Sequence, residues 1–500
     1  MASLEIAGVR LEVEHRNVGA DGGGTLRVLD SEGRERLRFD CFERLPHFHL
    51  DPGGRDEVTA LDPLGDPIAW TIGELERDLE GYLGRAGFAL EDRVDRGKLA
   101  PILGAAEQAL RCPIPDLDAI EPAALRQRRG EKWRLYGPEV LPAWVADMDF
   151  PVAAPIQRAF RDLVRRSDFG YPRNPSVDGL PTLFAERMAE RFGWQVEPRL
   201  VEVIIDVVQG IFLALHTYAE IGEGAVVQTP IYPPFLGALQ QTQRALVESP
   251  LALGPAGYEV DLDHLRSVGD ARTRLLLLCN PHNPSGRVFT RAELEGIAQV
   301  ALEQGWIVIA DEIHADLVYE GRRHIPFASL SPEIAARTVT LTSATKAFNV
   351  AGMRCAVAAF GSRELKARFN ALGGRHAHGG ASTAGMLAME TAWRHCQPWL
   401  DHVVGYLEAN RDFVARFAAE NLEGIVTHVP EATYLAWLDC RALELPEGPH
   451  SFFLHRARVG LNDGATFGTP GDGYVRLNFA TSRAILRELL ERMAASLKER

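Results

Sequence analysis

Lysine is scarce in this 500-residue chain, and one of its five lysines differs from the others. Lys346 has no charged residue within seven positions on either side, and it follows the apolar run Val339–Thr342. The other four each lie within two residues of other charges, as solvated lysines do. An amine in the setting of Lys346 is expected to lie in a dry pocket, where desolvation lowers its pKa and makes it a nucleophile toward carbonyl groups. A lysine that snorkels at a sheet edge is the alternative. The pattern favours a Schiff-base lysine at position 346.

A second candidate is Asp311, which closes the otherwise apolar run Trp306–Ala310. A Schiff-base cofactor acts as an electron sink while its ring nitrogen stays protonated, and a buried carboxylate can hold that proton. Asp311 fits this role. An N-cap of a following helix is the alternative for this aspartate.

A phosphate group on such a cofactor would need hydroxyls, helix N-terminal amides and a cation. Ser343 precedes Lys346 by three residues, and Arg354 follows it by eight. Gly210 is expected to open the helix after the run Val203–Ile205. These residues therefore predict a phosphate site beside Lys346.

The ring itself would need an aromatic partner and a donor to its phenolate oxygen. Tyr232 is placed to stack on the ring. Asn283 can donate to the oxygen, although its NPxNP context is also an ordinary turn sequence. The combination of all these residues points to a cofactor of the pyridoxal phosphate type.

The elements that must position these side chains are short apolar runs that alternate with amphipathic stretches from about residue 200 onward. Helical stretches such as Ile211–Glu220 and Arg291–Gln304 separate several of the runs. This alternation predicts an α/β domain with a mostly parallel sheet. The expected strands are Val203–Ile205, Ala225–Gln228, Leu275–Leu278, Trp306–Ala310, Val339–Thr342 and Ala356–Phe360.

Ligands bind at the carboxyl ends of the strands in open α/β sheets. Tyr232, Asn283, Asp311 and Lys346 each follow a different expected strand, and His314 lies three residues after Asp311. One crevice is therefore expected to collect all five side chains.

The first hundred residues have a different pattern. Leu4–Glu14 and Gly24–Phe42 alternate apolar and polar residues as hairpin strands do, and Trp70–Gly87 has helical spacing. We expect an α+β accessory domain of unknown role over 1–95, a linker with one short helix over 96–120, and a catalytic region over 121–500. Within that region we expect a large domain over about 160–395 and a small α+β domain over about 121–159 plus 396–500.

Composition and charge exclude several classes of protein. The formal charge is −14, and residues 1–100 hold 21 acidic and 13 basic side chains, which disfavours a nucleic-acid partner. We expect no membrane span and no export signal, because no apolar stretch is long and uninterrupted enough and the start lacks a basic region before an apolar one. Six scattered cysteines without CxxC spacing favour a reducing cytoplasm.

The phrases around these residues closely resemble those of fold-type I pyridoxal phosphate enzymes of the class I/II aminotransferase family, over about residues 121 to 500. Within that family the chain is most similar to the MalY/PatB branch of cystathionine β-lyases, the C–S lyases. The phrases that carry the resemblance are LPAWVADMDFPV (141–152), FGYPRNP (169–175), TPIYPPF (229–235), CNPHNPSGRVF (279–289), DEIHADLVY (311–319), SATKAFNVAGMR (343–354), ATYLAWLDCR (432–441), LNDGATFG (461–468) and YVRLNFATSR (474–483).

The resemblance implies roles for individual residues. Lys346 would form the internal aldimine, and Arg476 would hold the substrate α-carboxylate in a two-pronged contact. Tyr171 would reach the phosphate of the neighbouring subunit, which implies a homodimer with shared active sites. The implied cofactor contacts come from Asp311 at the pyridine nitrogen, Asn283 at the phenolate oxygen, Tyr232 on the ring, and Ser343, Arg354 and the Gly210 turn at the phosphate.

His314 departs from the general aminotransferase pattern, which usually has tyrosine at that position. The C–S lyase branch also has histidine there, so the departure favours that branch. A metal-ligand role for His314 is disfavoured because no second ligand lies at suitable spacing.

The expected function is β-elimination from a cysteine S-conjugate such as cystathionine, which gives a thiol, pyruvate and ammonia. Aminotransfer uses the same contact residues and is the runner-up. A non-catalytic binding or regulatory protein on the same fold is the alternative of another class. The sequence does not identify the amino-acid substrate.

The segment FDCFERLPHFHLDP (39–52) of the N-terminal domain places His47 and His49 on one strand face, near Cys41. These side chains suggest a metal site, but a fourth ligand is lacking, and an ordinary hairpin surface is the favoured interpretation. We therefore expect no metal.

Overall fold

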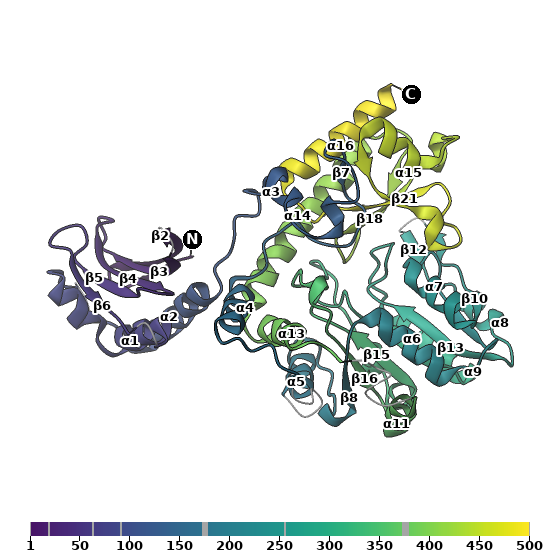
Figure 1. Cartoon of the computed structure of the whole chain (residues 1–500), viewed down its shortest axis with the longest axis horizontal. Helices are drawn as coiled ribbons and strands as arrows, with labels where there is room; N and C mark the ends of the chain where they lie inside the picture. The colour runs from purple at the N-terminus through teal and green to yellow at the C-terminus, as the bar shows by residue number, and fades with distance from the viewer. Residues whose placement is uncertain are drawn as a thin grey trace. The chain divides into compact units, whose positions relative to one another are not determined.

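A computed structural model shows that the chain divides into two compact units (Figure 1). The first contains residues 1–115 together with 153–158 and 395–399, and the second contains 116–152, 159–394 and 400–500. The structure describes residues 2–18, 21–62, 65–90, 93–172, 179–254, 257–372 and 380–499.

The N-terminal unit is a six-stranded antiparallel meander with two helices. Its strands pair in chain order, and alternate residues face the helices, as period-two patterning requires. Phe39, Phe48 and Tyr82 form an aromatic cluster in its core. The elements are β1 (Ala2–Ile6), β2 (Val9–Val18), β3 (Asp21–Leu29), β4 (Glu35–Phe42), β5 (His47–Leu50), β6 (Glu57–Ala60), α1 (Pro67–Arg85) and α2 (Arg96–Arg111).

The expected linker over 96–120 differs from the structure, because most of it forms α2 and belongs to the N-terminal unit. Leu99, Leu103 and Leu110 of α2 are buried in the same core as the strands. Asp95 caps this helix through Gly97 N, and Pro101 is accommodated inside it. The domain therefore extends to about Pro115.

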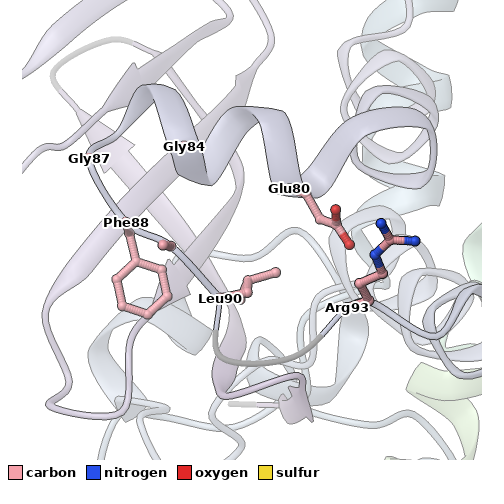
Figure 2. A pocket seen from close by; sticks show the side chains of 7 residues that line it. Glu80, Gly84, Gly87, Phe88, Leu90 and Arg93 are labelled. Carbon is pink, nitrogen blue, oxygen red and sulfur yellow. The ribbon is translucent and has the colours of Figure 1, made fainter.

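A hollow of about 490 Å³ lies beside the C-terminal turns of α1 in this unit. Figure 2 shows Phe88 and Leu90 as its apolar side chains, with Glu80 and Arg93 pointing toward one another. None of the residues that we predicted for the cofactor or substrate lines it.

The second unit contains a seven-stranded sheet with the order β10-β9-β13-β14-β15-β16-β8. Strand β16 is antiparallel to both of its neighbours, and the remaining pairs are parallel, so the expected mostly parallel sheet is confirmed. The strands are β8 (Val201–Ile204), β9 (Gly224–Val227), β10 (Ala245–Glu248), β13 (Thr273–Cys279), β14 (Ile307–Asp311), β15 (Thr338–Thr342) and β16 (Ala356–Phe360). Of these seven strands, β10 alone is not among those expected, because it is an edge strand with exposed residues and lacks a buried apolar run.

Helices cover both faces of this sheet. Leu275 and Leu277 of β13 pack in one apolar cluster, whereas Leu276 and Leu278 pack in another, as alternation along a strand requires. The first cluster includes α6 (Val207–Tyr218), α7 (Pro233–Thr242) and α11 (Arg363–Ala371), and the second includes α8 (Leu262–Val268), α9 (Arg291–Gln304) and α10 (Pro332–Ala335).

A smaller sheet follows near the C-terminus, with the order β17-β18-β21-β20. Strand β7 (Leu141–Pro142) pairs with β19 (Val459–Gly460), so the segment before residue 152 joins the C-terminal part. The elements here are β17 (Val426–Thr427), β18 (Leu435–Asp439), β20 (Asn462–Asp463), β21 (Tyr474–Asn478), α15 (Gly448–Phe452) and α16 (Arg483–Lys498).

The remaining helices and strands connect these parts. They are α3 (Pro122–Arg126), α4 (Ala154–Arg165), α5 (Leu180–Phe192), α13 (Thr383–His395), α14 (Gln397–Asn421), β11 (Ala252–Gly254) and β12 (Gly257–Glu259). None of the helices in the described part of the chain is both long and apolar enough to cross a bilayer.

The position of α2 predicts how truncations behave. Deletion of residues 1–95 removes the strands that cover Leu99, Leu103 and Leu110, whereas deletion of residues 1–115 removes the helix as well. We expect the shorter deletion to bind a hydrophobic dye and to scatter light more strongly than the longer one, because it exposes an apolar helix face. Equal solubility of the two proteins would contradict the assignment of α2 to this unit.

Candidate active site

Lys346 lies in the loop after β15 and is placed by the strand that ends at Thr342. Its Nζ donates a hydrogen bond to the carbonyl oxygen of Ala146 at 2.8 Å. Burial lowers the pKa of this amine, although the negative charge of Asp147 acts in the opposite direction. A larger share of the amine is therefore neutral, and nucleophilic, than for an exposed lysine.

Asp311 is the last residue of β14, and the sheet register places it opposite Cys279 and Leu341 of the flanking strands. It is buried, and the backbone N–H of Ile313 donates to its Oδ1 at 3.0 Å. Burial, with a smaller contribution from the neighbouring charge of Glu312, raises the pKa of this carboxyl to about 7. Such a carboxyl group can gain or lose a proton near neutral pH.

Arg476 projects from β21 and is 3% exposed. Its Nη1 donates to Asn283 Oδ1 at 2.9 Å, and its Nη2 donates to the carbonyl of Trp144 at 3.1 Å. Among the described residues, no carboxylate lies within ion-pair distance of this guanidinium, and its Nε has no hydrogen-bond partner. Burial lowers the pKa of Arg476 to about 10, so it remains a buried cation in need of an anion.

His314 and Tyr232 complete the polar set at the ends of the strands. Burial lowers the pKa of His314 to about 3, so its imidazole is neutral, and Nδ1 has no partner among the described residues. Its ring meets that of Tyr434 edge-on, with centroids 6.1 Å apart. Tyr232 stands at the start of α7, and burial raises the pKa of its hydroxyl.

The predicted phosphate residues gather around the N-terminus of α6. Asp206 caps this helix by accepting from Gln209 N at 2.7 Å, and Nε of Arg354 donates to the same carboxylate at 3.0 Å. The hydroxyl of Ser343 donates to the carbonyl of Cys355 at 2.6 Å and accepts from the N–H of Thr345. The hydroxyl proton of Ser343 is therefore already engaged.

Gly210 does not open α6, which begins at Val207. Its N–H donates to the carbonyl of Asp206, so this amide is already used within the helix. A Cβ at this position would lie 2.8 Å from Ile204 and 2.9 Å from Leu341. The absence of a side chain thus lets the first turn of α6 pack closely on the sheet.

Tyr171 is fully exposed in the single chain. A role toward a neighbouring subunit remains a prediction. Residues 173–175 of the phrase around it lie outside the described residues.

Residues 144–150 form a backbone strap that the residue types alone do not reveal. Side chains from distant parts of the second unit hold its carbonyl groups. Asn478 donates to the carbonyls of Val145 and Asp147, both at 2.7 Å, and Tyr434 shares the carbonyl of Ala146 with Lys346. Backbone carbonyl groups are present in every residue and cannot be recognised from residue types. Only the resemblance of LPAWVADMDFPV (141–152) to the sequences of the C–S lyase branch points to this segment.

A buried ion pair supports the strap. The charged residues around Lys132 in the sequence predict a solvated lysine, but it is 4% exposed. Its Nζ lies 3.0 Å from Asp149 Oδ2 and donates to the carbonyl of Asp147. Trp133 Nε1 donates to the other oxygen of Asp149 at 2.7 Å. The prediction is wrong because proximity to charges along the chain does not determine burial.

The site fits the cofactor class that we expected. A buried amine with a lowered pKa, a buried carboxyl group and a buried guanidinium without an anion meet at the carboxyl edge of the sheet. The orphaned ring nitrogen of His314 and Nε of Arg476 are polar atoms that a bound polar ligand can satisfy.

This fold and site define a fold-type I pyridoxal phosphate enzyme. The chain belongs to the aminotransferase class I and II family, whose model matches residues 150–493. The fold class and the cofactor class that we expected are confirmed. Residues 3–110 match a domain of unknown function, DUF7700.

The relatives place the chain near the C–S lyases. It is 34% identical to cystathionine β-lyase PatB of Bacillus subtilis over 363 residues, which cover 72% of this chain and 93% of PatB. It is 38% identical to a putative cystathionine β-lyase of Mycobacterium leprae, with 75% and 96% of the two chains covered. A putative PLP-dependent β-cystathionase structure from Corynebacterium diphtheriae matches with a TM-score of 0.72 and 35% identity, covering 77% of this chain and 99% of that one. The expected similarity to pyridoxal-phosphate-dependent C–S lyases is confirmed.

The Lys132–Asp149 pair gives a first test of the strap. Replacement of Lys132 by Met leaves a buried carboxylate without its cation, which should lower the free energy of unfolding by about 3–5 kcal/mol. Denaturant unfolding with cofactor present measures this effect. The double variant Lys132→Met/Asp149→Asn keeps an acceptor for Trp133 and should recover much of the loss, whereas an additive loss would contradict the pairing.

The raised pKa of Asp311 gives a second test, in cofactor-free protein. Because the folded state holds this proton up to about pH 7 and the unfolded state releases it near pH 4, the contribution of Asp311 to stability falls as pH rises through that range. Asp311→Asn should therefore stabilise the cofactor-free protein at pH 8 by about 1–3 kcal/mol, with a smaller gain at pH 5.

The matched control for this test is Asp316→Asn. Asp316 accepts ion pairs from Arg187 at 2.8 Å and Arg191 at 3.1 Å, so its loss should destabilise the protein at both pH values. Thermal unfolding at the two pH values compares the variants. Destabilisation by Asp311→Asn at pH 8 would show that this carboxyl is not an uncompensated buried charge.

Proposed function

We propose that the chain cleaves the Cβ–S bond of a cysteine S-conjugate of the cystathionine type. The Cα proton and the thiolate leave the substrate, the thiolate takes up a proton, and hydrolysis of the remaining enamine carbon skeleton with one water gives pyruvate and ammonia. The products are thus a thiol, pyruvate and ammonia, with no external oxidant or reductant.

The observation that carries this proposal is the buried guanidinium of Arg476, which has no carboxylate partner among the described residues, beside the buried amine of Lys346. Arg476 offers two parallel N–H donors, which match the two oxygens of an α-carboxylate. Its hydrogen-bond partners among the described residues, Asn283, Asn462 and the Trp144 carbonyl, are neutral, so an incoming carboxylate would supply a negative charge that none of them provides. This selects an amino acid and fixes its orientation.

Lys346 and Asp311 handle the protons. With a pKa lowered by burial, Lys346 can take the Cα proton as a neutral amine, and the dry surroundings strengthen its interactions. Asp311 lies at the end of the adjacent strand, where a carboxyl group with a pKa of about 7 can hold a ring N–H. The neutral ring of His314 adds no positive charge that would compete with these groups.

Pyridoxal phosphate, when bound, supplies the electron-withdrawing ring that stabilises negative charge at Cα. Lys346 would hold it covalently, Asp311 would contact its ring nitrogen, and Asn283 its phenolate oxygen. Tyr232 and His314 would pack at the ring. Its phosphate would lie at the first turn of α6, where Gly210 permits close packing, with Arg354 and, after rotation of its hydroxyl, Ser343 as donors.

Elimination is favoured over aminotransfer by the relatives, which are named cystathionine β-lyases at 34–38% identity and are covered over more than nine-tenths of their length. Aminotransfer remains the second candidate because the family model bears that name and the same contact residues serve both reactions. The two differ in where the proton goes after it leaves Cα.

The proposal includes a homodimer with shared active sites. The full exposure of Tyr171 in the single chain supports a role in a neighbouring subunit, where it would contact the phosphate. A reducing, cytoplasmic location is also proposed, because all six cysteines are buried and none forms a disulfide.

Pyruvate formation tests the reaction. With cystathionine, cystine and S-alkyl or S-aryl cysteines, we expect equal amounts of pyruvate and free thiol (or persulfide from cystine) without added keto acid. Lys346→Ala should lower the rate by roughly 10³-fold or more, because it removes the base. Lys98→Ala, at an exposed lysine of the N-terminal unit, is the matched control and should leave the rate unchanged. Strict dependence on a keto acid would establish aminotransfer instead.

A further inference from the structure

Three chemically distinctive side chains meet on the N-terminal sheet, on the face opposite to α1 and α2. Asp40 of β4 pairs directly with His47 of β5, and His49 lies two residues farther along the same face. Phe39 and Phe48, the neighbours of these residues, face the helices and their core. Asp40 is 2% and His49 6% exposed, so this face holds a buried polar cluster.

The ring nitrogens of both histidines point at one carboxylate oxygen. Nε2 of His47 and Nε2 of His49 each lie 3.4 Å from Oδ2 of Asp40. One ligand atom from each residue lies within 4.8 Å of the others. Ligand atoms around a tetrahedral Zn²⁺, with bonds of about 2.0–2.1 Å, are about 3.3 Å apart, so the spacing fits a shared metal ion.

The far side of each ligand is held by a second polar group. Nδ1 of His47 contacts the carbonyl of Leu45 at 2.8 Å, and Nδ1 of His49 contacts Oδ1 of Asp56 at 2.6 Å. Both acceptors select the tautomer that carries its proton on Nδ1, which leaves the Nε2 lone pair available. Outer carbonyl and carboxylate acceptors of this kind orient the histidine ligands of metal sites.

Asp40 is held in the same manner. The hydroxyl of Thr25, a fully buried residue on the adjacent strand, donates to its Oδ1 at 2.6 Å. This contact fixes the carboxylate so that Oδ2 faces the two imidazoles. All three candidate ligands therefore have both a common focus and a partner that orients them.

Arg38 provides positive charge at this focus. Its Nη2 lies 2.8 Å from Nε2 of His49, and its Nε donates to Asp40 Oδ2 at 3.0 Å. Because this long side chain is 20% exposed, we expect it to turn toward solvent when another cation takes over these acceptors. Arg16 lies 3.5 Å from the other oxygen of Asp40 and is partly exposed as well.

Cys41, the third member of the site that the sequence suggested, faces the core instead. Its Sγ contacts the carbonyl of Pro67 at 3.6 Å and the hydroxyl of Thr71 at 3.4 Å. Because neighbouring residues of a strand face opposite sides of the sheet, Asp40 and not Cys41 lies on the same face as the two histidines and is the candidate ligand.

We propose that Asp40, His47 and His49 bind a divalent first-row transition metal such as Zn²⁺ through one carboxylate oxygen and two Nε2 atoms. The nitrogen and oxygen donors suit zinc, iron or manganese better than a soft cation. Three protein ligands leave a position open for water or a small ligand, and the 24% exposure of His47 gives access from solvent.

To test this site, the full-length, cofactor-loaded enzyme is first treated with a chelator to remove bound metal and is then titrated with Zn²⁺. We expect one Zn²⁺ per chain by calorimetry and elemental analysis, and a rise in the melting temperature. His47→Ala and Asp40→Asn should each weaken binding by about 100-fold or more, since a lost ligand should cost at least as much as the 10- to 100-fold effect of an outer partner. Asp56→Asn should weaken it by about 10- to 100-fold.

Two control variants distinguish this site from its alternatives. His15→Ala removes an exposed histidine of the same sheet and should bind Zn²⁺ like the parent protein. Cys41→Ser should also retain binding, because its thiol faces the core. His47→Ala is the least disruptive ligand variant, and an unchanged metal-free circular dichroism spectrum would show that it still folds. Absence of stoichiometric Zn²⁺ in the parent, or unchanged affinity in a folded His47→Ala protein, would overturn the proposal.

Discussion

Burial of charge at the edge of one sheet is the constraint on which the active site depends. Lys346, Asp311 and Arg476 are all withdrawn from water. Burial lowers the pKa of Lys346 and Arg476 and raises the pKa of Asp311, so in each case it favours the neutral form. Such groups are costly unless other polar atoms or a ligand satisfy them. The protein supplies neutral carbonyl and amide partners, which leaves the balance of charge to be completed by what binds.

Parallel strands make this concentration of groups possible. Asp311 and the loop that carries Lys346 follow neighbouring strands whose ends lie at the same edge, so residues 35 positions apart share one crevice. The second sheet contributes Arg476 from β21, and helix α6 contributes its first turn. Asp311 and Arg476 thus lie within strands, and Lys346 lies in the loop that follows one.

The position of Asp311 at the end of a buried strand, and of Lys346 in the loop after another, can be predicted from the sequence, because an isolated lysine after an apolar strand and an aspartate that closes one are local signals. Prediction fails where contacts depend on distant backbone. The strap carbonyls have no side-chain signature, and the sequence around Lys132 indicates a solvated side chain although it is buried against Asp149. The prolines in and after helix α2 predict a linker, whereas the burial of that helix depends on the whole N-terminal sheet. Likewise, whether Cys41 or Asp40 lies on the same sheet face as His47 and His49 can be settled only once the strand register is known.

The carbonyl of Ala146 has a consequence of its own, since it accepts from Lys346 and Tyr434 at the same time. Tyr434 and Asn478 belong to the part that carries the small sheet, while Lys346 follows the large one. The strap therefore connects the large sheet's loop to the part that carries the small sheet. The acceptor that favours the protonated form of Lys346 is therefore held by a tyrosine from the other sheet's part of the chain, so the proton affinity of this amine depends on a contact outside its own sheet.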